Sequence, residues 1–269
     1  SLNIGLDPFL KMIDHFKLPI QRCALLTTVN VTSIDITQKM TNHIPKLLEL
    51  SKNPEPQLQK SAIKTINNIA SRVSPENIKT EISTLLCQSA PLFLDALINL
   101  STNELHISKI IEADVDFEKI FKETNNAEKQ MSILKLILNL LPSARCLNQF
   151  PIPKHPRPDK KSTEFAVKIQ PILLKLLLEN PLSLKYLLMC ITFTLNVHKF
   201  ELTEEIAFVL RGFGKLPENS PYVLAILTFF ESSPLLVQSH ILDSLVCGDM
   251  LKQQKGWFTR TLNKLRKKV

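Results

Sequence analysis

The 269-residue sequence predicts an all-α protein and, more narrowly, an α-solenoid built from stacked helical repeats. Three observations predict this fold. The chain contains 5 glycines, far below the usual share of about 7%, which argues against a β-sandwich or a glycine-rich nucleotide-binding fold. Apolar residues recur at helical spacing almost everywhere, and a short signature returns at a nearly fixed period.

The apolar residues lie three or four positions apart, which places them on one face of a helix, as in Leu58, Ala62, Ile66 and Ile69. Alternation over the length of a strand is scarce. Capping residues followed by proline divide the pattern into about thirteen to fifteen helices. The breaks fall at 53–56, 74–75, 89–91, 180–181, 218–221 and 232–234.

The signature is a small residue followed six positions later by Asn and an aliphatic residue, at 24–30, 62–68 and 190–196. Looser copies end at Asn99 and Asn139. Successive Asn residues are 38, 31, 40 and 57 positions apart, and a linker of about 20 residues explains the last gap. A period of about 40 is typical of armadillo and HEAT units. We therefore expect an armadillo/HEAT-like right-handed α-solenoid with a concave groove, and an irregular helical bundle is the alternative.

The predicted organisation has three parts. Residues 1–141 form armadillo-like repeats, and 142–162 form an insertion loop rich in proline and basic residues, which cannot sustain a helix. Residues 163–269 form further repeats ending in a basic capping helix. The loop is either a basic docking or localisation motif or a solvated connection between repeats.

Charge and cysteine usage restrict the environment and the partners. The net charge is +8, but residues 249–269 carry seven basic residues and one acidic residue, so the rest of the chain is nearly neutral. This argues against a specific nucleic-acid surface spread along the fold. Five scattered cysteines predict separate core thiols in a reducing compartment. With no transmembrane segment or signal peptide in the sequence, we expect a cytoplasmic and/or nuclear protein, and a start at Ser1 suggests a piece of a longer chain.

No catalytic, cofactor or metal site is predicted. The six histidines are scattered, and no hydrolase, metalloprotease or phosphate-loop motif occurs. Gly212 and Gly214 fit the end of a helix better than a phosphate loop. Glu204 and Glu205 follow Thr203 and fit a capped first turn, where negative charge complements the helix dipole.

The candidate groove residues are Asn30, Lys64, Asn68 and Asn196. The innermost helix of a solenoid repeat directs polar side chains into the groove, where an Asn can bind the main chain of an extended peptide. The alternative is that these Asn residues cap or bridge neighbouring helices. Both roles remain open at the level of sequence.

The C-terminal segment predicts a basic amphipathic helix with Phe258, Leu262 and Leu265 on one face. It caps the last repeat, or it contacts an acidic partner or an anionic membrane surface. Its basic residues include Lys252, Lys255, Arg260 and Lys264.

The first twenty-five residues resemble the armadillo segment of HECT E3 ubiquitin ligases of the ubiquitin-fusion-degradation type. The resemblance is carried by Gly5-Leu6, Leu10, Asp14, Phe16 and the block Ile20-Gln21-Arg22-Cys23-Ala24-Leu25. The thioester-forming cysteine of a HECT domain has no counterpart here. The resemblance implies a scaffold that recognises a protein substrate, a degron or ubiquitin, and not an active transferase.

Two other functions are alternatives. An importin- or adaptin-like transport adaptor shares the architecture, but its groove for basic peptides carries repeated Trp and acidic residues, and the single Trp here is Trp257. A protein that binds membranes or nucleic acid through its basic tail is the other.

Overall fold

The structure is a computed structural model that describes residues 7–13, 15, 17–34, 38–124, 126–141, 160–179, 184–195, 197–198, 200–214, 219, 222–223 and 226. These residues form twelve α-helices and three 3-10 helices and contain no strand, so the all-α prediction is confirmed. No helix in this part of the chain is long and apolar enough to cross a membrane.

The chain forms two compact units, Ser1–Asp116 and Phe117–Val269. This division falls earlier than the predicted one between residues 1–141 and 163–269, which stays a prediction. Part of the predicted loop at 142–162 is helical, because a helix begins at Lys160, where no proline follows until Pro171. Residues 142–159 lie outside the described ranges.

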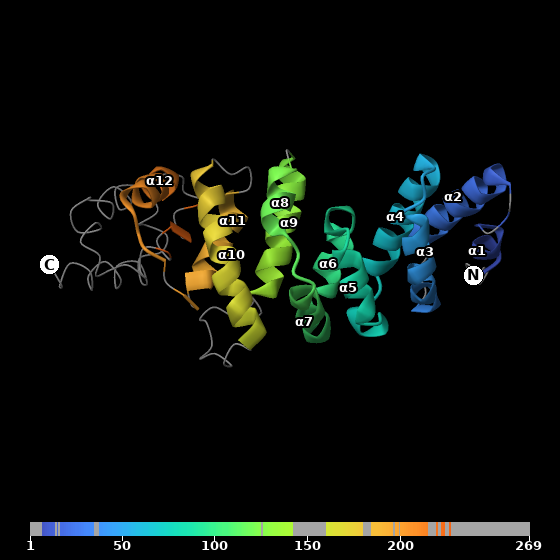
Figure 1. The fold of residues 1–269 in the computed structure, drawn as a ribbon, viewed down its shortest axis with the longest axis horizontal. Coiled ribbons are helices and arrows are strands. Elements are labelled where there is room, and N and C mark those ends of the chain that lie inside the picture. The colour runs from blue at the N-terminus through green and yellow to red at the C-terminus, as the bar shows by residue number, and fades with distance from the viewer. Residues whose placement is uncertain are drawn as a thin grey trace. The chain divides into compact units, whose positions relative to one another are not determined.

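The first unit contains seven of the α-helices (Figure 1). Helix α2 packs against α1 and α4, α4 packs against α3 and α6, and α5 packs against α6 and α7. The α-helices are α1 (Asp7–Ile13), α2 (Leu18–Ile34), α3 (Ile44–Leu50), α4 (Pro56–Ala70), α5 (Glu81–Cys87), α6 (Leu94–Leu100) and α7 (Glu104–Glu112). The 3-10 helices are η1 (Gln38–His43), η2 (Pro75–Asn77) and η3 (Ala90–Leu92).

Helix α4 shows how the sequence builds this unit. Its predicted apolar row is confirmed, since Leu58, Ala62, Ile66 and Ile69 are all fully buried or nearly so. Full burial of each larger side chain contributes about 1.5–3 kcal/mol. Proline occupies the first turn, and the capping side chain is Glu55, which accepts a hydrogen bond from the Leu58 backbone N–H.

The predicted breaks in the first unit are confirmed as helix starts, but two of them begin a different kind of helix. Pro56 begins an α-helix, whereas Pro75 and Pro91 lie in single 3-10 turns. Ser74 and Ser89 give no side-chain cap to these turns. The breaks at 180–181 and 232–234 lie outside the described residues.

Helices α2, α4 and α6 run parallel to one another. Near the start of α2, Arg22 binds Glu55 just before α4 at 2.6 Å, and just after α4, Arg72 donates to the Ser33 carbonyl near the end of α2 at 2.7 Å. In the next pair, Asn67 of α4 donates to the Leu92 carbonyl just before α6, and further along both helices Asn99 of α6 donates to the Ala70 carbonyl at the end of α4. The three helices therefore follow one another in the same direction.

The second unit contains α8 (Phe117–Lys122), α9 (Ala127–Leu140), α10 (Lys160–Leu178), α11 (Leu184–Leu195) and α12 (Glu204–Gly214). Helix α10 packs against α8, α11 and α12, and α11 packs against α9. The buried Gln170 amide donates to the Thr194 hydroxyl at 3.1 Å and to the His198 carbonyl at 2.8 Å, which ties α10 to the end of α11.

Both predictions for α12 are confirmed. The Thr203 hydroxyl accepts a hydrogen bond from the Ile206 backbone N–H at 3.3 Å, with Glu204 and Glu205 in the first turn. The helix ends at Gly214, so Gly212 and Gly214 belong to its last turn and form no phosphate loop.

The prediction of five core thiols is wrong for Cys23, which is exposed on α2. Cys87 and Cys190 are buried, and burial raises the pKa of the Cys87 thiol to about 12 and also raises that of Cys190. Both buried thiols therefore stay protonated and unreactive at neutral pH. Cys146 and Cys247 lie outside the described residues.

A buried polar chain links α5, α7 and η2. The Ser83 hydroxyl lies 2.7 Å from His106 Nδ1, and His106 Nε2 lies 2.9 Å from the Pro75 carbonyl. Since a carbonyl only accepts, Nε2 carries the proton and Nδ1 accepts from Ser83. Both side chains are buried, so the pair has a structural role and no access to a substrate.

We expect Ser83→Ala to lower the free energy of unfolding by about 1–3 kcal/mol, because it leaves His106 Nδ1 buried without a partner. Urea denaturation followed by circular dichroism measures this change. Thr84→Ala is the matched control, because Thr84 is exposed on the same helix, and it should change stability by less than about 0.5 kcal/mol. Equal stabilities of the two variants would show that the hydrogen bond contributes nothing.

Candidate protein-binding face

Neighbouring helices of the α2, α4 and α6 layer are bridged by asparagine side chains. Asn68 Nδ2 on α4 lies 3.4 Å from the Val29 carbonyl and 3.2 Å from the Thr32 hydroxyl, both on α2. On α6, Asn99 Nδ2 donates to the carbonyls of Ala70 and Val73 at 2.8 and 2.9 Å. Asn68 and Asn99 thus form hydrogen bonds with the preceding helix of this layer, which is α2 for Asn68 and α4 for Asn99.

Asn67, the residue beside Asn68, contacts the segment on the other side of α4, next to α6. Asn67 Nδ2 donates to the Leu92 carbonyl, just before α6, at 2.8 Å. Lys64 lies three positions before Asn67 and four before Asn68, so it projects between them, away from the buried row of α4. Lys64 is exposed, and so is Lys60 one turn earlier.

Helix α2 presents an exposed stripe on the same side of the layer. Arg22 and Val29 contact α4, and Leu26 and Asn30 lie next to them around the helix, on the side away from the buried Thr28. Leu26 is 56% exposed, so its apolar surface is open to solvent. On α6, Asp95 occupies the corresponding exposed position.

These residues define a candidate binding surface, which we call the α2–α4–α6 face. Its centre is basic because of α4, and its α2 edge is uncharged, with one apolar and one amide side chain. The members are Leu26 and Asn30 of α2, Lys60 and Lys64 of α4, and Asp95 of α6.

The predicted groove residues differ in their surroundings. Asn30 and Lys64 are exposed on the α2–α4–α6 face. The Asn68 amide nitrogen is engaged with α2, which is the bridging role that the sequence left as an alternative. Asn196 and the basic tail residues Lys252, Lys255, Arg260 and Lys264 lie outside the described residues.

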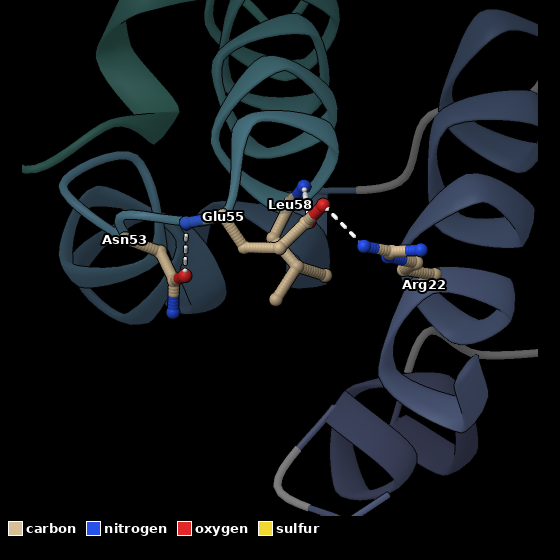
Figure 2. Close-up of polar contacts among 4 residues, drawn as sticks. All are labelled: Arg22, Asn53, Glu55 and Leu58. Carbon is tan, nitrogen blue, oxygen red and sulfur yellow. Dashed lines mark hydrogen bonds and ion pairs between the residues drawn. The ribbon is translucent and has the colours of Figure 1, made fainter. Parts of the chain in front are cut away.

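The resembled block at 20–25 contains a residue whose role the sequence did not suggest. Figure 2 shows Arg22 on α2 reaching Glu55, the capping residue of α4. The Asn53 side chain accepts from the Glu55 backbone N–H at 2.9 Å, and the two Glu55 oxygens divide between Arg22 and the Leu58 N–H. Arg22 therefore fixes the start of the next helix in the layer.

Electrostatics favour the charged form of Glu55. Desolvation raises its pKa, but hydrogen bonds from the backbone N–H groups of Leu58 and Gln57, the hydrogen bond from Arg22 and the charge of Arg22 outweigh it. The pKa of Glu55 is therefore below its ordinary value.

Within the described ranges, no group of three or more His, Cys, Asp or Glu residues could hold a metal ion. The α2–α4–α6 face combines an ammonium pair, an amide, an apolar side chain and the Asp95 carboxylate, which are groups that can contact another protein.

We expect the stability supplied by Glu55 to be lost in acid. Its pKa in the folded protein is below the value of about 4.3 in an unfolded chain, so the contribution is present above about pH 4.3 and disappears as the pH falls through the folded-state value. Glu55→Gln keeps an oxygen for the Leu58 N–H but cannot ionise. The difference in Tm between wild type and Glu55→Gln should shrink as the pH falls from 7 to 3, and a difference that stays constant over this range would contradict the prediction.

A second pair of variants distinguishes the bridging role of Asn68 from the exposed position of Asn30. Asn68→Ala should lower the free energy of unfolding by about 1 kcal/mol, because it removes the bridge to α2. Asn30→Ala should change it by less than about 0.5 kcal/mol, because Asn30 is exposed. Chemical denaturation of both variants measures this difference, and a stable Asn68→Ala protein would contradict the bridging role.

Comparison with protein-family models gives no match, and comparison with curated proteins gives no significant match.

Proposed function

We propose that the chain is a non-catalytic helical-repeat scaffold, an armadillo/HEAT-like right-handed α-solenoid, that binds a segment of another protein on the α2–α4–α6 face. The observation that carries this proposal is the parallel order of α2, α4 and α6, with repeated bonds from each helix to the one before it. A parallel succession of this kind is what translation of one repeat into the next produces.

The spacing of these bonds supports a repeating unit. Asn68 reaches back 39 and 36 residues to α2, and Asn99 reaches back 29 and 26 residues to the end of α4. Each bond joins similar parts of successive helices, although the second step is shorter. The number of residues between the bonded partners is close to the spacing of the Asn residues in the sequence signature. This similarity links the signature to the packing.

The exposed surface of this layer suits a polypeptide. Leu26 offers apolar contact, and the Asn30 amide has both a donor and an acceptor for a main chain. Solenoids bind extended segments along such layers because every repeat contributes one helix to a continuous surface.

The resemblance carried by the first twenty-five residues supports a biological setting for the proposal. By that resemblance, the bound protein is a substrate, a degron or ubiquitin, which the scaffold presents to a HECT-type ubiquitin ligase for ubiquitination and degradation. An importin- or adaptin-like adaptor for basic cargo is less favoured, because the centre of the face carries Lys60 and Lys64 rather than carboxylates.

The proposal is tested with three immobilised forms of the whole chain: wild type, the face variant Leu26→Asp/Lys64→Glu, and the control variant Leu105→Asp/Lys79→Glu. Leu105 is 69% exposed on α7 and Lys79 is exposed before α5, so the control makes the same chemical changes off the face. Circular dichroism verifies that all three are folded.

Purified ubiquitin, ubiquitin chains and a cell extract are the probes, with ubiquitin-pathway enzymes and ubiquitinated proteins quantified by mass spectrometry. Wild type and control should retain ubiquitin, its chains or these enzymes at least 10-fold more than the face variant. Equal recovery on all three forms would contradict a role for the face. Face-dependent recovery of transport cargo alone would favour the adaptor function.

A further inference from the structure

The centre of the α2–α4–α6 face carries two lysines that have no ion-pair partner among the described residues. Lys60 and Lys64 are four positions apart on α4, where like charges repel each other. Several lysines of other helices do have ion-pair partners: Lys109 binds Glu112 at 2.9 Å, and Lys122 and Lys175 both bind Glu118. The unpaired lysines therefore lie in the middle of the surface proposed for binding.

The nearest carboxylates on the layer do not neutralise this charge. Glu55 is bound to Arg22 and to the Leu58 N–H. Asp95 on α6 forms no ion pair with Lys60 or Lys64. The amide nitrogens of Asn67 and Asn68 are engaged with neighbouring helices, so the two ammonium groups are the charged donors that α4 presents on this face.

The spacing of the lysines fits a single carboxylate. Four residues of helix rise about 6 Å, so both side chains can reach one anionic group placed between them. A segment that crosses the layer also meets α2, whose axis lies about 8–10 Å from that of α4. Leu26 is at the level of Lys64, because it is about one turn before Val29 as Lys64 is one turn before Asn68.

We infer that the occupant of the α2–α4–α6 face is an acidic protein segment in an extended conformation, with an Asp or Glu held between Lys60 and Lys64 and an apolar side chain on Leu26. About three extended residues span the distance between neighbouring helix axes, so the acidic and apolar residues lie about three positions apart. This inference rests on the proposed function and specifies the chemistry of the bound segment.

A protein segment is favoured over a nucleic acid, the other abundant polyanion. The face has no aromatic side chain on which a base could stack, and Asp95 would repel a phosphodiester backbone. Leu26 has no complementary group on such a backbone, whereas it can pack against an aliphatic side chain of a peptide.

The probe is a phage-displayed library of random 12-residue peptides, selected on the immobilised whole chain. We expect selected peptides to be enriched in Asp or Glu with an apolar residue about three positions away. Fluorescence anisotropy of synthetic copies should give at least 10-fold weaker binding to Lys60→Glu/Lys64→Glu and less than 2-fold weaker binding to Lys52→Glu/Lys79→Glu. Lys52 and Lys79 are exposed lysines outside the face, so the control has the same net charge.

A charge exchange makes the test specific. Peptides whose acidic residue is replaced by Lys should lose binding to wild type and regain it on Lys60→Glu/Lys64→Glu.

Selected peptides that lack acidic residues but depend on Leu26 would overturn the inference and leave the proposed function standing. Peptides that bind all face variants equally would contradict both. A labelled 20-nucleotide single strand that binds more tightly than any peptide, and loses binding in Lys60→Glu/Lys64→Glu, would overturn the inference in favour of nucleic acid.

Discussion

The last carbonyl groups of a helix have no partner within that helix, and the first unit of this protein satisfies several of them from the next helix in the layer. Arg72, at the end of α4, donates to the carbonyl of Ser33 near the end of α2. Asn99 on α6 donates to the carbonyls of Ala70 and Val73. The ends of α2 and α4 are therefore each completed by the next helix of the layer, and these bonds fix both the parallel direction and the register of the layer.

Several polar side chains in the interior of the two units are hydrogen-bonded as well. Ser83, His106 and the Pro75 carbonyl form one buried chain, and Gln170 binds Thr194 and the His198 carbonyl in the second unit. A buried polar group without a partner is costly in a low-dielectric interior, so these bonds select one arrangement of the helices. The apolar rows supply most of the free energy, and the polar bridges determine which helix contacts which.

Periodicity and capping signals in the sequence predicted much of the helical structure. The buried row of α4, the Thr203 cap and the helix end at Gly214 all depend on residues close together in the chain, so local rules were sufficient. The short 3-10 turns at Pro75 and Pro91 could not be predicted, because proline begins either kind of helix.

The candidate site was less predictable, because its residues acquire their roles from distant partners. The signature marks Asn30 and Asn68 as equivalent, yet Asn68 bridges two helices and Asn30 is exposed. Arg22 could be quoted as part of a resembled block, but its partner Glu55 is 33 residues away. A helical wheel of α2 would have placed Leu26 on one side with Cys23 and Asn30, but only the packing of α4 shows that this side stays open.

Dependence of each helix on the one after it gives the layer a direction. If the chain were shortened from the α6 end, the main-chain oxygens of Ala70 and Val73 would lose the Asn99 amide as their donor. If it were shortened from the α1 end, the groups set free would be long polar side chains such as Arg72, which solvent accommodates readily. Truncation therefore exposes backbone acceptors at one end of the layer and side-chain donors at the other.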